Sequence, residues 1–197
     1  MQSKINRLLK SAVLAAIPAA CLLTGLSVNA EQSIGAAIFK DNGQLLQPEG
    51  FRKWVFIGAP LTPHGLNGGK AGFPEYHHVY VNPDAFAVYE KTGTFPEGTV
   101  IAKELVLLKK GKHKDGSYDA PSGRGFFAEK YNGMDVMVKD SKRFKKTQGW
   151  GFFNFSHHAP PYTSAASAAP VESCSGCHKE NAKKDMVFTQ FYPILNH

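Results

Sequence analysis

The residues with the clearest chemistry lie near the end of the chain, in the segment Cys174-Ser175-Gly176-Cys177-His178. The spacing C-x-x-C-H is the pattern of covalent c-type haem attachment. Two thiols at this distance can reach the two vinyl groups on one edge of a porphyrin, and the histidine that follows can turn beneath the ring to reach the iron. The motif therefore predicts one covalently bound haem c, held by Cys174 and Cys177, with His178 as the iron ligand.

Two other chemistries use a pair of cysteines at this spacing. A thioredoxin-like dithiol lies near the start of a βαβ unit, whereas this pair lies close to the C-terminus. A zinc site requires a second pair of ligands, and the remaining cysteine, Cys21, lies in a predicted leader segment. Haem attachment is therefore the favoured interpretation.

The opposite side of the iron decides what the haem can do. Met186 follows His178 too closely to reach the other haem face, while Met134 and Met137 remain possible sixth ligands from upstream. The simpler interpretation is a five-coordinate iron with an open side. An open side favours ligand binding or chemistry over electron transfer alone.

Lys103 interrupts the apolar run 100–108, which is predicted to be a strand. By alternation it shares a face with Ile101 and Leu105, while Glu104 points to the other face and is an unlikely partner. An apolar surrounding favours the neutral, nucleophilic form of a lysine. The alternative is a lysine at a strand edge, ion-paired or reaching into water.

Asp135 is predicted to share a strand face with Met137 and Lys139. A carboxylate beside an open iron can accept protons from a bound substrate. The alternative is a solvated aspartate that follows a tight turn at Asn132-Gly133.

Four histidines flank these positions. His77 and His78 are neighbours on one predicted strand, so they point to opposite faces. His157 and His158 precede a proline-rich loop and are expected at the surface. None of the four is favoured as an iron ligand.

Residues 1–30 have the organisation of a secretory signal peptide. Basic residues near the start precede an apolar run over residues 12–26, and Val28-Asn29-Ala30 offers small residues for cleavage. Pro18 and Gly25 interrupt the run, which disfavours an uncleaved membrane anchor. We therefore expect export to the periplasm and a mature haem domain of residues 31–197 without a membrane segment.

The formal net charge is +7, of which Lys4, Arg7 and Lys10 contribute three. The remaining basic residues form small clusters, such as those around residues 109–114 and 142–146. They are interpreted as solvated turns and strand ends, with docking of an acidic redox partner as the alternative. No nucleic-acid-binding motif accompanies them.

The mature chain predicts strands with a few short helices. Strands are expected at 54–57, 77–81, 99–108, 126–131, 134–139 and 150–155. Asn82, Pro83 and Gly93 delimit a short helix, and the haem segment is expected to be helical over residues 173–181. The fold class expected is α+β, mainly an antiparallel sheet with short helices and a C-terminal haem-binding helix. The long amphipathic helices of a four-helix cytochrome are absent from the sequence.

An exported β-rich chain with a C-terminal haem motif resembles the cytochrome P-460 family and its relative, cytochrome c′-beta. The segments that carry the resemblance span nearly all of the mature chain. They are Phe51-Arg52-Lys53-Trp54-Val55, Thr62-Pro63, Leu66-Asn67-Gly68-Gly69-Lys70, Val79-Tyr80-Val81-Asn82-Pro83, Gly98-Thr99-Val100, Lys103-Glu104-Leu105-Val106 and Val187-Phe188-Thr189-Gln190-Phe191-Tyr192-Pro193.

The resemblance implies an activity. Proteins of the cytochrome P-460 branch oxidise hydroxylamine to nitrous oxide or nitric oxide and carry a lysine bonded to a haem meso carbon, which matches Lys103. Their distal proton acceptor, usually a glutamate, matches Asp135, which is one methylene shorter. A family arginine is replaced by His77, to which no role is assigned.

The resemblance also implies partners and an alternative. A soluble cytochrome is expected to accept the electrons, and the family forms homodimers. The cytochromes c′-beta lack the lysine bond, line the distal side with phenylalanine and bind nitric oxide, so a nitric oxide carrier or scavenger is the alternative. A plain electron carrier would need Met134 or Met137 on the iron.

Overall fold

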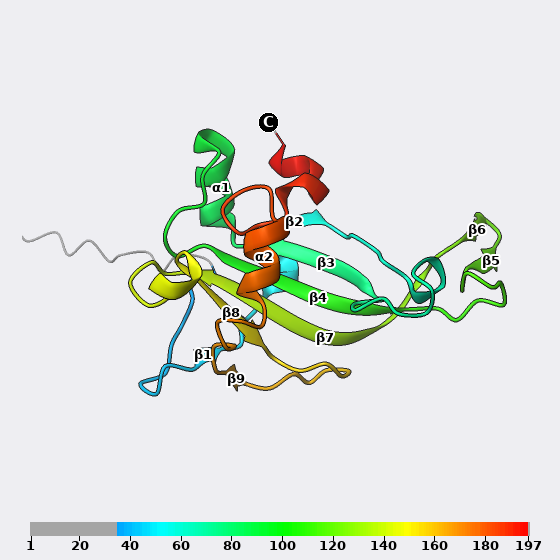
Figure 1. Cartoon of the computed structure of the whole chain (residues 1–197), viewed down its shortest axis with the longest axis horizontal. Helices are drawn as coiled ribbons and strands as arrows, with labels where there is room; N and C mark the ends of the chain where they lie inside the picture. The colour runs from blue at the N-terminus through cyan, green and yellow to red at the C-terminus, as the bar shows by residue number, and fades with distance from the viewer. Residues whose placement is uncertain (1–34, 197) are drawn as a thin grey trace, which may run out of the picture. The chain divides into compact units, whose positions relative to one another are not determined.

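The computed structural model describes residues 35–196, which form short helices around β-sheets (Figure 1). The strands are β1 Leu45–Leu46, β2 Val55–Gly58, β3 Tyr76–Val81, β4 Val100–Leu108, β5 Tyr118–Ala120, β6 Gly123–Gly125, β7 Ala128–Lys139, β8 Trp150–Asn154 and β9 Ala165–Ala166. The α-helices are α1 Pro83–Thr92 and α2 Ser175–Asn181, and the 3-10 helices are η1 Phe51–Lys53, η2 His64–Leu66, η3 Lys145–Thr147, η4 Thr189–Phe191 and η5 Pro193–Leu195.

The expected signal peptide at residues 1–30 lies outside the described residues. Within residues 35–196, no helix combines the length and the apolar character that a membrane crossing requires.

The largest sheet has five strands in the order β2-β3-β4-β7-β8, and every neighbouring pair is antiparallel. Strands β1 and β9 form a second small sheet, and β5 and β6 form a hairpin at the end of the sheet remote from α1 (Figure 1). The predicted fold class, α+β with a mainly antiparallel sheet and short helices, is confirmed.

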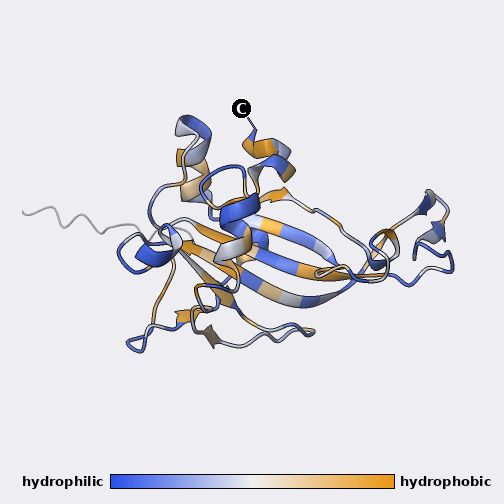
Figure 2. Ribbon diagram, viewed as in Figure 1, coloured by the Kyte–Doolittle hydropathy of each residue, from blue (hydrophilic) through white to orange (hydrophobic). Residues whose placement is uncertain are grey.

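Strand β4 lies in the middle of this sheet, between β3 and β7. Its β-branched and aliphatic side chains suit a strand covered on both faces, and most of its residues are buried. Figure 2 shows hydrophilic and hydrophobic residues in succession along the sheet strands. The alternation separates Lys103 from Glu104 as expected, because adjacent residues of a strand point to opposite faces.

The predicted turn at Asn132-Gly133 is wrong, because residues 128–139 form one continuous strand. Leu105 pairs with Gly133 and Val106 pairs with Tyr131, so Asn132 is the extra residue of a β-bulge. Strand β4 continues alongside both parts of β7, and a turn at this point would leave the end of β4 without its ladder. The bulge preserves pairing on both sides.

Each face of the five-stranded sheet has its own apolar layer. We call the face that carries Val79, Ile101, Lys103, Asp135 and Phe152 the site face. It packs against α1 and the C-terminal segment, whose buried residues include Met186, Val187, Tyr192 and Leu195. The opposite face, which carries Ala102, Met134, Val136 and Phe153, packs against the N-terminal part of the described chain.

Helix α1 runs from Pro83 to Thr92 and is stopped by Gly93, as the sequence predicted; this glycine adopts a left-handed conformation (φ 66°). Asn82 occupies the N-cap position, but its side chain instead accepts a hydrogen bond from the Val100 amide at 2.8 Å. The Tyr89 hydroxyl donates a hydrogen bond to the Leu195 carbonyl at 3.1 Å, which ties α1 to the C-terminal segment.

Candidate functional site

The C-x-x-C-H motif lies at the start of helix α2, two residues later than the predicted helix start. Cys174 is the N-cap residue, and Cys177 and His178 lie in the helix. Residues three apart on a helix share a side, so the two thiols lie on the same side. Both are free thiols, with Cys174 half-buried against the site-face layer and Cys177 exposed.

The imidazole of His178 is fixed in orientation. Its Nδ1 lies 2.7 Å from the Met186 carbonyl oxygen, and its ring packs between Phe152 and Phe188, each with a centroid separation of 4.8 Å. Burial lowers the pKa of His178 below its ordinary value. A carbonyl bonded to Nδ1 favours the tautomer whose Nε2 carries a lone pair, which is the arrangement of a metal-binding histidine.

Asp185 anchors the turn that presents the Met186 carbonyl. Its carboxylate accepts hydrogen bonds from Lys139 Nζ at 2.5 Å and from the Trp150 indole at 3.2 Å. Asp185 and Met186 both adopt positive φ angles, 49° and 62°, which non-glycine residues adopt only when their surroundings hold them there. The ends of β7 and β8 therefore position the carbonyl that orients His178.

Lys103 and Asp135 face each other across the β4–β7 ladder. They are paired in register on the site face, and Lys103 Nζ lies 2.9 Å from Asp135 Oδ2. Each side chain is about a quarter exposed, at 25% and 26%. Lys103 Nζ also lies over the ring of Phe73, 4.2 Å from its centroid. The structure thus brings together two residues that the sequence predicted separately as site residues.

The carboxylate of Asp135 has three polar neighbours. Besides Lys103 on Oδ2, Asn154 Nδ2 donates to Oδ1 at 2.7 Å and His157 Nε2 lies 3.4 Å from Oδ1. Burial alone would raise the pKa of Asp135, but the charge of Lys103 and the hydrogen bonds outweigh burial and lower it. The carboxylate is therefore ionised at neutral pH and in direct contact with a cation.

His77 lies on the same face, and its ring contacts Phe73 edge-on at 5.8 Å. Burial and the nearby charge of Lys103 lower the pKa of His77 to about 4, so its imidazole is neutral at pH 7. Its buried Nε2 has no hydrogen-bond partner in residues 35–196. Buried polar atoms in proteins are nearly always hydrogen-bonded, so this nitrogen indicates that a bound group or water lies beside it.

The sequence did not predict the contacts that His157 makes with Asp135 and Phe73. The residue was expected only at the surface, and its side chain is indeed 48% exposed, but its ring also reaches Asp135 and Phe73. Nothing in a loop sequence after a strand specifies such a contact, because it depends on the path of the loop.

The haem motif and the Lys103–Asp135 pair lie on the same side of the sheet. Helix α2 crosses this face (Figure 1), where His178 contacts Phe152 of β8. The charges of Lys103 and Asp135 both act on His178. Met134 lies on the opposite face and cannot share a site with His178, whereas Met137 packs against the site-face layer.

These residues fit a covalently bound haem. Two free thiols and an oriented imidazole stand at one side, aromatic rings flank the imidazole, and a buried unpartnered nitrogen remains at His77. The residues that would hold the group are Cys174, Cys177 and His178, with Lys103 on the facing strand.

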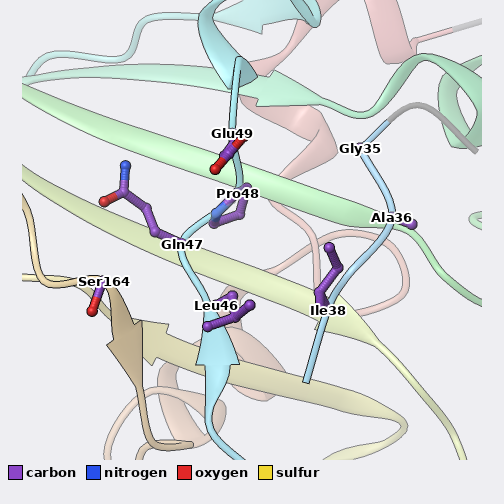
Figure 3. Close-up of a pocket in the computed structure, with 8 residues that line it drawn as sticks. All are labelled: Gly35, Ala36, Ile38, Leu46, Gln47, Pro48, Glu49 and Ser164. Atoms are coloured by element: carbon purple, nitrogen blue, oxygen red, sulfur yellow. The ribbon is translucent and has the colours of Figure 1, made fainter. Parts of the chain in front are cut away.

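A cavity of about 620 Å³ lies elsewhere, between the strand β1 region and the start of the described chain. Figure 3 shows its lining side chains, among which Glu49 is the one ionisable group drawn. It contains no cysteine, histidine or lysine among its lining residues. Among the described residues, the lining therefore offers neither a thiol nor an imidazole for haem attachment, and it shares no residue with the site described above.

Residues 48–189 match the family model described as cytochrome P-460. The matched range covers the five-stranded sheet and α2, and so contains Lys103, Asp135, Cys174, Cys177 and His178. Among curated proteins, none matches the chain.

Proposed function

Because the chain belongs to the cytochrome P-460 family, whose members carry haem, we propose that it is an exported c-type haem enzyme that oxidises hydroxylamine. In this proposal Cys174 and Cys177 hold a single haem through thioether bonds, and His178 Nε2 binds the iron. When bound, the haem supplies an iron that withdraws electrons from the substrate and passes them to an acceptor. Because His178 is the one protein ligand proposed for the iron, hydroxylamine would bind without displacing a side chain.

Asp135 is assigned to proton transfer. Conversion of hydroxylamine to nitric oxide releases three protons with three electrons, and conversion of two hydroxylamines to nitrous oxide and water releases four of each. A carboxylate on the site face can receive these protons one at a time. The observation that carries the proposal is the pairing of Lys103 with Asp135 at 2.9 Å on the sheet face that α2 covers.

Lys103 is assigned to a covalent bond with a meso carbon of the haem. Forming this carbon–nitrogen bond would remove one hydrogen from the amine and one from the carbon, so two protons and two electrons would leave. A peroxide is the class of oxidant that would accept them. Lys103 must first lose a proton to become nucleophilic, and the carboxylate of Asp135 lies within hydrogen-bond distance to take it.

The bond would also change Asp135. At present the ammonium of Lys103 is the main attraction that lowers the pKa of this carboxylate. An amine bonded to the ring would no longer carry that charge, so the pKa of Asp135 would rise and its Oδ2 would be released. Both changes make Asp135 a better proton acceptor.

A nitric oxide carrier of the cytochrome c′-beta kind is the second candidate. It is favoured by the ring of Phe73, which lies 4.2 Å from Lys103 Nζ and brings a phenylalanine to the site face, as on the distal side of the cytochromes c′-beta. Such a protein would bind nitric oxide without turning over hydroxylamine.

Two measurements on the purified holoprotein separate the candidates. The mass of the Lys103 peptide after digestion shows whether this residue carries the haem peptide. Steady-state consumption of hydroxylamine with an added electron acceptor shows turnover. A Lys103 peptide of unmodified mass together with no turnover would reject the enzyme and leave the nitric oxide carrier.

The cellular setting follows as part of the proposal. Export by residues 1–30 would place the protein in the periplasm, where a soluble cytochrome would accept its electrons and where two copies would form a homodimer. Detection of the processed chain starting at Glu31 in a periplasmic fraction would support this setting, and retention of residues 1–30 in the membrane fraction would contradict it.

A further inference from the structure

His157 contacts the carboxylate that is assigned to proton transfer. Its Nε2 lies 3.4 Å from Asp135 Oδ1, on a side chain that is nearly twice as exposed as that of Asp135, at 48% against 26%. The other two neighbours of the carboxylate differ in kind. Asn154 does not ionise, and the nitrogen of Lys103 is assigned to the bond with the haem. His157 is thus the contacting group whose ring nitrogens can both accept a proton from the carboxyl and reach water.

We propose that His157 relays protons between Asp135 and the solvent. This inference rests on the proposed function, because it requires Asp135 to collect protons at the site face. The proton leaves the Asp135 carboxyl for Nε2 of the neutral imidazole, which becomes an imidazolium. The imidazolium then releases one proton to water. Loss of the Nε2 proton regenerates the starting tautomer directly, whereas loss of the Nδ1 proton leaves the Nε2–H tautomer, which proton exchange with water converts back; no electrons move in these steps.

Protons must be removed from Asp135 during turnover. A carboxylate can hold only one proton at a time. Hydroxylamine oxidation releases several protons in succession, and each must leave before the next arrives. A neighbouring imidazole with access to water removes them without any movement of β7.

The structure gives the His157 ring its position. The ring packs edge-on against Phe73, with centroids 6.0 Å apart. Gly133, at the bulge of β7, leaves the space, because a Cβ there would lie 3.1 Å from the His157 ring and 2.9 Å from the Ser156 carbonyl oxygen. The charged or titratable side chains that face this corner are Asp135 from β7, Lys103 from β4 and His77 from β3.

Ligand binding provides a test that does not depend on turnover. Hydrogen cyanide must give up its proton when it binds ferric haem, whereas nitric oxide binds without proton transfer. We expect His157→Gln to slow the association of hydrogen cyanide with the ferric holoprotein at pH 7 roughly tenfold, because Asp135 remains as the first acceptor. Association of nitric oxide should stay within about twofold of the unmodified protein. Stopped-flow absorption measures both rates.

Three controls complete the test. His158→Gln alters the adjacent ring, which bonds to its neighbour Ala159 rather than to Asp135, and should change neither rate. His157→Asn guards against a folding defect in the first variant. Added 2,6-lutidine, a base too hindered to bind iron, should restore the cyanide rate of His157→Gln.

Each contrary outcome has a distinct meaning. A normal cyanide rate in His157→Gln beside a slow rate in Asp135→Asn overturns the relay and leaves Asp135 as the acceptor. A normal rate in Asp135→Asn overturns both assignments. Equal slowing of cyanide and nitric oxide in both His157 variants shows a disturbed pocket and overturns the relay.

Discussion

Two neighbouring residues of β4 carry opposite charges to opposite faces of the sheet, and their surroundings differ sharply. Lys103, on the site face, pairs with Asp135 at 2.9 Å while both side chains stay about a quarter exposed. Glu104, on the opposite face, is fully buried and pairs with Arg52, whose Nε lies 2.9 Å from Oε2. Tyr162 donates a hydrogen bond to Glu104 Oε1 at 2.7 Å.

The difference separates a fixed charge pair from one that can change partners. Both carboxylate oxygens of Glu104 accept hydrogen bonds, from the charged guanidinium of Arg52 and from the hydroxyl of Tyr162. The guanidinium of Arg52 also packs against the ring of Tyr131, 4.4 Å from its centroid. Asp135 instead shares its oxygens among a lysine, an amide and a half-exposed histidine. A saturated buried network rigidifies a fold, whereas a partly exposed cluster of titratable groups can exchange protons.

The largest expected effect tests the site face. Replacing Asp135 with Ala should lower hydroxylamine turnover at least about a hundredfold, the usual contribution of a positioned proton acceptor. The free energy of unfolding should fall by about 1–2 kcal/mol, because the pair is mostly buried but still reaches water. Steady-state kinetics and urea denaturation of the holoprotein give the two values.

Asp135→Glu is the matched control, since it keeps a carboxylate at this position and should retain most of the turnover. Turnover in Asp135→Ala equal to that of the unmodified protein would remove this residue from the mechanism.

On the opposite face we expect a substitution to lower stability and to leave turnover unchanged. Replacing Glu104 with Ala should lower the free energy of unfolding by about 2–3 kcal/mol, because a hydrogen-bonded carboxylate is lost from a buried network. The half-exposed guanidinium of Arg52, at 44%, can turn to water, which keeps the cost at the lower end. Turnover for each folded molecule should be unchanged. Urea denaturation measures the first quantity, and turnover normalised to bound haem measures the second.

A double variant sharpens this prediction. Arg52→Met combined with Glu104→Leu should recover most of the lost stability, because apolar residues of similar volume often replace a buried pair without cost. A loss of turnover in folded Glu104→Ala would show that the two faces are not independent.

A third expected effect concerns pH. The pKa of His77 is lowered from 6.5 to about 4, so between these values the unfolded chain binds a proton that the folded chain does not. Stability then rises with pH across this window and is lost as pH falls from about 6.5 to about 4, by about 3 kcal/mol. His77→Phe should flatten this dependence, measured by urea denaturation at a series of pH values. The same acid loss in the variant would assign it to other groups.

Patterns along the chain predicted much of this arrangement. Strand alternation correctly separated Lys103 from Glu104, and Pro83 and Gly93 correctly bounded α1. The register that places Lys103 opposite Asp135 was not predicted. Such features depend on local backbone geometry, which the sequence specifies directly. The roles of the cysteines, His178, Lys103 and Asp135 remain predictions, although the structure brings these residues to one face.

The sequence did not predict features that depend on contacts between distant parts of the chain. Asn132-Gly133 has the composition of a tight turn, but pairing with the long strand β4 overrode it and produced a bulge. The contact of His157 with Asp135 depends on that bulge and on the loop that follows β8. The pairing of Arg52 with Glu104 joins residues far apart in the chain, and no local pattern marks it.

The smallest expected effect comes from a substitution that changes the pKa of Asp135 but keeps its pair with Lys103. Asn154 Nδ2 donates a 2.7 Å hydrogen bond to the ionised Asp135 and so helps to lower its pKa. In Asn154→Ala the pKa of Asp135 should rise, because the charged form loses a donor. The acceptor must be deprotonated to work, so the acidic limb of the pH–rate profile should move to higher pH. Turnover at neutral pH should change less than about tenfold, since Asp135 remains ionised there.

Asn154 lies at the exposed end of β8, so stability should hardly change. An acidic limb that moves to lower pH, or stays in place, would show that Asp135 does not set it, and the contrast between the two faces of β4 would then be one of burial alone.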